Sequence, residues 1–257
     1  MMRQIISLFT RFVPRHRLQV FAAFVLRVVG IFYRGNRYED PISGKTYRKL
    51  LPYGRTVVRP NALAPHSMSL ERHRLIWLYL RERTDFFTAP HSLLHIAPEY
   101  CFLKPFRKLG NIEYVTADLI SPWADVKLDV QAMPFPSSQF DVVICNHVLE
   151  HVQSDIKAMG EIYRVLKPGG FAILQVPIDI SREKTLEDPS INTPELREQY
   201  YLQRDHQRLY GRDYADRLRS VGFRVDENHF VDELPLNLVE RYALPVGEVL
   251  FICNKPD

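Results

Sequence analysis

The strongest hydrophobic pattern in the chain lies between residues 140 and 177. Residues 140–145 form an almost unbroken apolar run, which predicts a strand buried on both faces of a parallel sheet. Apolar residues at helical spacing follow over residues 156–166, and Pro-Gly-Gly at residues 168–170 is expected to end that helix. A second apolar run occupies residues 171–176. Strand, helix and strand in this order predict a crossover unit with two parallel strands.

Further apolar segments extend this unit on both sides, at residues 92–97, 112–116, 126–130, 223–225 and 248–253. Together they predict an α/β fold with a seven-stranded, mostly parallel sheet and helices on both faces. The charged, breaker-rich segment 178–206 is too long for an ordinary connection, so it predicts a lid, with a helix over residues 194–203.

Residues 1–34 predict a basic, amphipathic helical arm, with helices over residues 1–13 and 18–33. The second stretch is too short for a membrane span, which needs about 20 residues. Residues 1–60 hold 12 Lys and Arg against 2 Asp and Glu, whereas the remainder holds 22 against 28. This favours a peripheral helix on an anionic membrane surface. The alternative is a helix packed on the domain or on a partner. Three widely spaced cysteines indicate a reducing compartment, so the expected location is the cytoplasm, at the inner face of the membrane.

Residues 35–68 are expected to form a ribbon-like segment. Asp40-Pro-Ile-Ser43 and Ala64-Pro-His-Ser67 stand where a zinc ribbon carries two cysteine pairs, although chance gives such turns too. Without cysteines this segment is expected to fold without metal. The main domain then covers residues 69–257. Near its start, the cluster Arg72 to Arg74 is interpreted as a solvated face in preference to a cleft.

Polar residues follow three successive strands of the predicted sheet. Asp118 ends the second, Asp129 lies in the third, and Asn146 and His147 end the fourth. The carboxyl ends of parallel strands meet at one edge, which is where open α/β sheets bind ligands. A carboxylate after the second strand can accept the hydroxyls of a ribose, and one about ten residues later can accept from an adenine. The arrangement predicts an adenosine-bearing ligand.

Three segments resemble the class I S-adenosylmethionine-dependent methyltransferases that act on small molecules: LDVQAMPFPSSQFDVVICNHVLEHV, EIYRVLKPGGFAILQVP and RDHQRLYGRDYADRLRSVGF. The resemblance covers roughly residues 90–254 and implies a Rossmann-like sheet whose last strand is antiparallel. It implies methyl transfer to a small-molecule or membrane-proximal acceptor, with S-adenosylmethionine as cofactor. By position it implies these cofactor-binding residues: Asp118 for the ribose, with Leu119 next to it, Asp129 with Val130 or Gln131 for the adenine, and Asn146 and His147 for the methionine end. The alternatives are a turn-capping Asp129 and a structural His147.

The first strand departs from the family pattern. The family usually has an acidic residue and then Gly-x-Gly, which lets backbone amides approach the cofactor closely. Here the loop is His-Ile-Ala-Pro-Glu at residues 95–99, similar to that of a bacterial methyltransferase subgroup. His95, Ala97 and Glu99 are expected to line the cofactor, with Glu99 in place of the missing acid. This departure motivates a second hypothesis, a non-catalytic S-adenosylmethionine-binding or scaffold protein.

The residues that would carry chemistry are histidines. Methyl transfer to a neutral oxygen or nitrogen needs a base for one proton, and an imidazole can supply it. His147, His151 and His206 are the candidates, and Arg208 beside His206 is a candidate to pair with an acidic substrate. No metal site is expected. The acidic main domain does not favour a nucleic-acid methyltransferase, and the lack of Gly-x-Gly-x-x-Gly does not favour a nicotinamide dehydrogenase.

Overall fold

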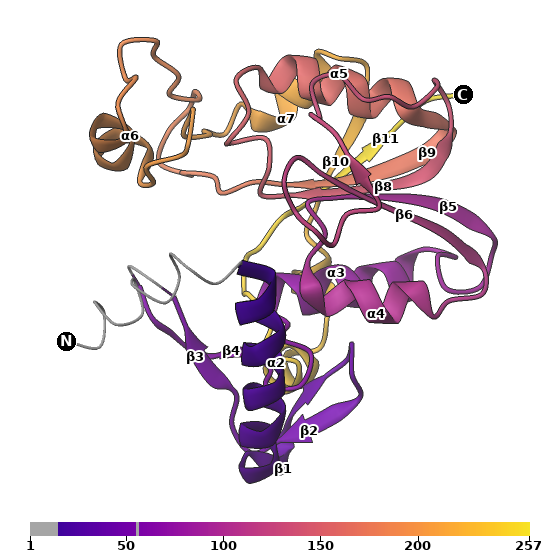
Figure 1. Cartoon of the computed structure of the whole chain (residues 1–257), viewed down its shortest axis with the longest axis vertical. Helices are drawn as coiled ribbons and strands as arrows, with labels where there is room; N and C mark the ends of the chain where they lie inside the picture. The colour runs from indigo at the N-terminus through magenta and orange to yellow at the C-terminus, as the bar shows by residue number, and fades with distance from the viewer. Residues whose placement is uncertain (1–14, 55–56) are drawn as a thin grey trace. The chain divides into compact units, whose positions relative to one another are not determined.

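The computed structural model describes residues 15–54 and 57–257 (Figure 1). The predicted helix over residues 1–13 lies outside these residues. The chain divides into two compact units. The first, here the N-terminal unit, comprises Met1–Thr88, Glu99–Leu109 and His229–Glu248. The second, here the sheet unit, comprises Ala89–Pro98, Gly110–Asn228 and Val249–Asp257.

A seven-stranded sheet forms the centre of the sheet unit (Figure 1). Its strands, in sheet order, are β10 (Arg224–Asn228), β11 (Leu250–Asn254), β9 (Leu166–Gln175), β8 (Phe140–Asn146), β5 (His91–Ile96), β6 (Ile112–Asp118) and β7 (Val126–Lys127). The pairs from β9 to β7 are parallel, whereas β11 runs antiparallel to both of its neighbours. This confirms the predicted Rossmann-like sheet and its antiparallel last strand.

Strand β8 lies in the middle of the sheet, between β9 and β5, and its apolar residues are buried on both faces. Val143 pairs with Leu94 of β5 and Ala172 of β9, and all three side chains are fully buried. Helices α5 (Asp155–Val165) and α7 (Tyr214–Arg219) contribute to the same hydrophobic core. The sheet is therefore held by the burial pattern from which the strands were predicted.

The turn between α5 and β9 is tighter than the sequence predicts. Helix α5 ends at Val165, and β9 begins at Leu166, before the Pro-Gly-Gly that was expected to end the helix. Phe140 pairs with Leu166, and the register then shifts before Val142 pairs with Phe171. A Cβ on Gly170 would lie 2.7 Å from the Asp141 carbonyl oxygen, so this close approach requires glycine.

The segment proposed as a lid follows β9 and belongs to the sheet unit. It contains α6 (Pro194–Tyr201), whose first turn is capped by the Thr193 hydroxyl. Isolated bridges pair Ile178 with Tyr210 and Leu186 with Leu209. The first part of the segment, from Ile178 to Leu186, therefore pairs at both ends with the residues that follow the segment.

The N-terminal unit contains long α2 (Arg15–Phe32) and two small hairpins. The hairpins pair β1 (Arg34–Asp40) with β2 (Lys45–Tyr47), and β3 (Leu51–Tyr53) with β4 (Arg59–Leu63). The other elements are α3 (Glu71–Arg83), α4 (Tyr100–Arg107), α8 (Phe230–Glu233) and α9 (Leu236–Arg241). No helix among the described residues is both long and apolar enough to cross a bilayer.

Polar side chains cross-link the turn that stands in place of the first cysteine pair. The buried Asp40 carboxylate accepts hydrogen bonds from the Ser43 hydroxyl, the Ser69 hydroxyl at 3.0 Å and the Ile42 amide at 3.3 Å. Charge-assisted bonds of this kind can hold a turn that a metal holds in a zinc ribbon.

The prediction that Arg72 to Arg74 form a solvated face is wrong for two of the three residues. His73 and Arg74 are buried. Arg74 donates to the carbonyl oxygens of Tyr242 at 2.6 Å and Ala243 at 2.8 Å, and also to those of Ala62 and Ser69. Burial lowers the pKa of Arg74 to about 10. The guanidinium can be buried because backbone carbonyl oxygens accept the hydrogen bonds that water would otherwise accept. The pattern of charges in the sequence does not reveal these acceptors.

Candidate functional site

The predicted strand-end residues gather at the carboxyl edge of the sheet. In the register, Ile96 of β5 pairs with Ala117 of β6 and Cys145 of β8. Asp118 and Asn146 are the next residues on those two strands, so they and Ala97 leave the sheet at the same level. The topology thus brings together residues that are far apart in the chain.

Asp118 is held by its own turn. Its Oδ1 accepts hydrogen bonds from the amides of Ile120 at 2.8 Å and Ser121 at 2.6 Å. Leu119 between them is 66% exposed. A carboxylate fixed in this way at a strand end is pre-organised to accept from a ligand without first losing side-chain freedom.

Asp129 lies after β7 and caps a turn. Its Oδ1 accepts from the Gln131 amide at 2.9 Å and from Gln131 Nε2 at 3.1 Å. Gln131 Oε1 in turn accepts from the Ser154 amide, just before α5. Val130 between them is buried. The turn-capping alternative therefore has direct support, and a role for these residues with adenine stays a prediction.

The first loop keeps an unusual backbone without glycine. Ala97 adopts a φ of +50°, in the left-handed region, and its amide donates to the Ala117 carbonyl at 2.8 Å. His95, two residues earlier, is fully buried within β5, with Nδ1 2.8 Å from the Tyr114 hydroxyl. Glu99 belongs to the N-terminal unit, where its Oε1 lies 3.7 Å from His73 Nε2.

His147 follows β8 in a second left-handed conformation, with φ +54°. Its amide donates to the Gln175 carbonyl at 2.7 Å, which fixes the residue to the end of β9. Its Nδ1 lies 3.3 Å from Oε1 of Glu150, whose side chain is only 2% exposed against 34% for His147. Asn146, immediately before, is buried. The result is a partly exposed imidazole oriented by a buried carboxylate.

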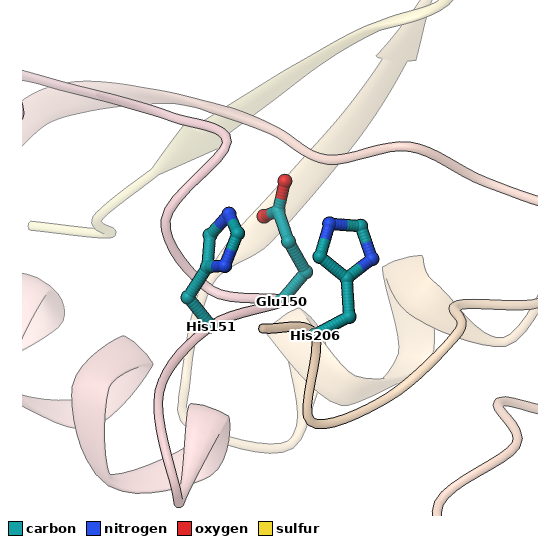
Figure 2. A group of neighbouring side chains, drawn as sticks. All are labelled: Glu150, His151 and His206. Carbon is teal, nitrogen blue, oxygen red and sulfur yellow. The ribbon is translucent and has the colours of Figure 1, made fainter. Parts of the chain in front are cut away.

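The other two predicted histidines lie beside the same carboxylate (Figure 2). The rings of His151 and His206 meet edge to face, with centroids 4.8 Å apart. His151 is partly exposed, with Nδ1 3.5 Å from Asp205 Oδ2. His206 is buried, and this burial lowers its pKa although the charge of Glu150 acts to raise it. The three predicted histidines therefore form one group around Glu150.

Glu150 is the member of this group that the sequence analysis did not select. Its signal is the three-residue spacing from His147, which allows a carboxylate to reach back to the imidazole. His206 lies far along the chain from both, so only the fold could bring it to Glu150.

Arg208 does not provide an anion site, which corrects the role considered for it. It is fully buried, and all five of its N–H donors are already used. They bond to the carbonyls of Leu149, Val152 and Gln153 and, twice, to Glu187 Oε1. This arginine ties the segment after α6 to the loop that carries Glu150 and His151.

Comparison with known proteins identifies part of this unit. Residues 108–174 match the family model described as a methyltransferase domain. This range runs from the start of β6 through β8 and α5 into β9, so it includes Asp118 and His147.

Similarity to individual proteins is local in sequence and broad in fold. The chain is 39% identical over 62 residues to the ubiquinone/menaquinone biosynthesis C-methyltransferase UbiE of Escherichia coli O1:K1, a match covering 24% of this chain and 20% of that protein. The chain thus spans about a fifth of the length of this relative.

Two solved structures illustrate the likeness in fold. The [4+2]-cyclase SpnF superposes with a TM-score of 0.50 and 16% identity, covering 84% of this chain and 91% of that one. Phosphoethanolamine N-methyltransferase 2 of Haemonchus contortus, in complex with S-adenosyl-L-methionine, gives a TM-score of 0.47 and 16% identity, covering 72% and 53%.

Proposed function

Because the chain carries a class I S-adenosylmethionine-dependent methyltransferase domain, we propose that it transfers a methyl group from S-adenosylmethionine to a small-molecule acceptor. The observation that carries the proposal is the carboxyl edge of the sheet, where a turn-fixed Asp118 lies on β6 and His147 follows β8. This is the edge at which such sheets bind nucleotides.

The residues at this edge fit the cofactor. Asp118 would accept the ribose hydroxyls, with Leu119 beside it, and Asp129, Val130 and Gln131 would face the adenine. Ala97 supports the fit because it adopts the left-handed turn that glycine usually supplies after the first strand. Asn146 and His147 would lie at the methionine end. His95 and Glu99 have internal partners in Tyr114 and His73, so any contact they make with the cofactor would compete with these.

His147 would act as the base for the acceptor. If its Nδ1 carries the proton that faces Glu150, its Nε2 is left to accept a proton from an acceptor hydroxyl or amine. When bound, S-adenosylmethionine supplies an electrophilic methyl group that the acceptor displaces from sulfur. The protein then has to hold the acceptor in line and remove one proton. His151 and His206 would assist from the other side of Glu150.

Cofactor binding tests the proposal first. S-adenosylhomocysteine at 100 times its dissociation constant should stabilise the full chain against unfolding by about 2.7 kcal/mol. Asp118→Asn keeps the oxygen that accepts from Ile120 and Ser121 but removes the charge. Losing a charged hydrogen bond should weaken affinity roughly 10- to 100-fold, reducing the stabilisation to between about 1.4 and 0.4 kcal/mol. Asp226→Asn, exposed on β10, is the control. No shift in the parent protein would contradict the proposal.

His147→Gln tests the base. Methyl-labelled S-adenosylmethionine incubated with the protein and small-molecule or lipid extracts should give a labelled product. The variant should lower the rate of labelling by roughly 10²- to 10⁴-fold, with unchanged binding of S-adenosylhomocysteine. Equal labelling by the variant would remove His147 as the base and leave the cofactor proposal standing.

A non-catalytic scaffold is the second candidate. It is favoured by Pro98, which deletes an amide donor from the first loop, and by the absence of glycine there. The fold alone does not decide between the two, since a structure with this fold is named for a cyclisation. The scaffold predicts no labelled product from any extract, whether or not S-adenosylhomocysteine binds.

We also propose that α2 docks on an anionic membrane surface. Its exposed apolar residues share one side of the helix, including Phe21, Phe24 and Phe32 at 65–73% exposure. The opposite side packs through Ala23 and Gly30, which are buried. Exposed basic residues of the same unit, among them Arg27, Arg34, Arg37, Lys45 and Lys49, would face anionic headgroups. Docking of α2 would bring the protein to a membrane that contains its acceptor.

A further inference from the structure

One cluster combines metal-ligating side chains with unpaired buried atoms. Glu150 and His151 come from the loop after β8, and His206 comes from the segment after α6. One ligand atom from each of the three lies within 4.8 Å of the others. Figure 2 shows the Glu150 carboxylate between the two imidazole rings.

Two atoms of this cluster lack a partner in the part of the chain that the structure describes. Oε2 of Glu150 and Nδ1 of His206 are buried and make no hydrogen bond there. The two residues are only 1% and 3% exposed. Leaving a buried polar atom unpaired costs about 1–3 kcal/mol, and more when the group is charged. Two such atoms in one cluster would be satisfied by a positive ligand that accepts lone pairs.

We propose that Glu150, His151 and His206 bind a divalent first-row transition-metal ion such as Zn²⁺. Two imidazoles and one carboxylate suit zinc, iron or cobalt, whereas Mg²⁺ and Ca²⁺ favour all-oxygen sites. His206 contributes a buried ring nitrogen, Nδ1, that makes no hydrogen bond within the described residues. This proposal differs from the expectation from the sequence that no metal binds.

The spacing allows closure around an ion. Zinc ligands lie about 2.0–2.2 Å from the metal, so neighbouring ligand atoms in a tetrahedral site are about 3.4 Å apart. Because 4.8 Å is the upper limit, closure requires the ligand atoms to approach by at most about 1.4 Å, to which rotation of the partly exposed His151 side chain can contribute. Three protein ligands leave a fourth position open, as in catalytic zinc sites.

Glu150 would connect the ion to the proposed base. Its Oε1 faces His147 Nδ1, while Oε2 is the unpaired atom, so one carboxylate can both ligate the metal and orient the imidazole. An acceptor oxygen in the open position would become more acidic. This catalytic role rests on the proposed methyl transfer, whereas metal binding itself does not.

Titration of the tag-free, chelator-treated full chain with Co²⁺ tests the site. Visible absorption reports nitrogen and oxygen coordination, and calorimetry with Zn²⁺ gives the stoichiometry. One ion per chain is expected. His151→Gln, at a partly exposed position, should fold and weaken binding by more than about 10-fold, since even outer-shell changes cost 10- to 100-fold. Glu150→Gln should do the same. His229→Gln, whose ring lies near exposed Asp232, is the matched control.

Failure of this inference is distinct from failure of the proposed function. Absence of a one-to-one Co²⁺ complex in the folded parent, or binding that persists unchanged in His151→Gln, would overturn the metal site. The same samples are then titrated with S-adenosylhomocysteine. Cofactor binding without metal binding would leave methyl transfer standing, and metal binding without cofactor binding would leave the metal site standing.

Discussion

Two residues at the carboxyl edge of the sheet have a backbone conformation that residues other than glycine rarely adopt. Ala97 and His147, which follow the paired strands β5 and β8, have φ values of +50° and +54°. A left-handed conformation costs a non-glycine residue about 1–2 kcal/mol, and such strain gathers at functional sites. The glycine-poor first loop therefore preserves the turn while giving up the residue that adopts it most easily.

Ala97→Gly should stabilise the protein slightly. Relief of the left-handed strain gains about 1–2 kcal/mol, and the greater freedom of glycine in the unfolded chain costs about 0.4–1 kcal/mol. The expected net effect is a rise of about 0.5 kcal/mol in the free energy of unfolding, measured in urea. Ala117→Gly on β6, a buried residue without positive φ, is the control and should destabilise by about 1 kcal/mol or more. If Ala97→Gly destabilises as much as the control, the strain is absent.

Single residues could be predicted from the sequence where position along a strand decides their place. Asp118 and His147 follow apolar runs, and parallel strands bring them to one edge. Arg208 and Arg74 could not be predicted, because their burial depends on carbonyl oxygens from distant segments. A charged residue in a sequence is normally predicted to be exposed. That prediction fails where backbone carbonyl oxygens of the folded protein replace the water around the charge.

At the scale of elements, the start of α5 is tied to the segment after the proposed lid. The buried Asp155 carboxylate receives two hydrogen bonds from Arg217, at 2.6 and 2.8 Å, and one from the Tyr210 hydroxyl at 3.0 Å. Burial acts to raise the pKa of Asp155, but the bond from Arg217 and the charges of Arg208 and Arg217 outweigh it and hold that pKa below its usual value. The carboxylate also suits the positive end of the helix.

Asp155→Asn should destabilise the protein at pH 7 by about 2 kcal/mol, because it removes the buried one of the two carboxylates that Arg208 and Arg217 share and leaves only Glu187. A depressed pKa stabilises the folded state above the unfolded value of about 3.9, and this contribution is lost as pH falls through the folded pKa. The difference between parent and variant should therefore shrink below about pH 4. Urea unfolding at several pH values measures it. Asp216→Asn, paired with Arg219 at the surface, should change stability by less than about 1 kcal/mol. A difference independent of pH would contradict the role of the charge.

The elements of the sheet were predictable because strand and helix have different hydrophobic periods. The crossover from β8 through α5 to β9 follows its sequence pattern closely, apart from the start of β9. That start depends on pairing between Phe140 and Leu166, which is a tertiary contact. The group of Glu150 and His206 depends on the bridges that return the chain after α6, and no local pattern specifies those.

At the scale of the whole molecule, the chain enters the N-terminal unit three times. Residues 229–248 return to it after β10, and Arg74 bonds to the carbonyls of Tyr242 and Ala243 there. Arg241 also pairs with Glu39 at 2.8 Å. The sequence predicts three consecutive parts, residues 1–34, 35–68 and 69–257, each formed by one continuous stretch of chain. A unit assembled from three separated segments is invisible to composition and charge, because its contacts are long-range.

The N-terminal unit also concentrates basic charge and exposed apolar surface, and this combination determines how membrane docking can be tested. The full chain should bind vesicles that contain anionic phosphatidylserine, and this binding should weaken as the salt concentration rises. It should bind neutral vesicles poorly. Lys45→Gln with Lys49→Gln removes two exposed charges and should cost about 2 kcal/mol, roughly 30-fold in partitioning. Phe21→Ser with Phe24→Ser should reduce binding at every salt concentration, since apolar burial is not screened.

Val246→Ser, at a residue 80% exposed in the same unit but outside α2, should leave vesicle binding unchanged. Loss of binding in the charge pair alone, with no effect of the phenylalanine pair, would mean that basic surface attracts the bilayer without insertion of α2. Salt-sensitive binding to RNA with no vesicle binding would replace the membrane by a nucleic acid as the partner of this unit. The basic and the apolar residues belong to one unit. If binding needs both the lysine pair and the phenylalanine pair, the partner surface must be both anionic and apolar, as a membrane containing anionic lipids is.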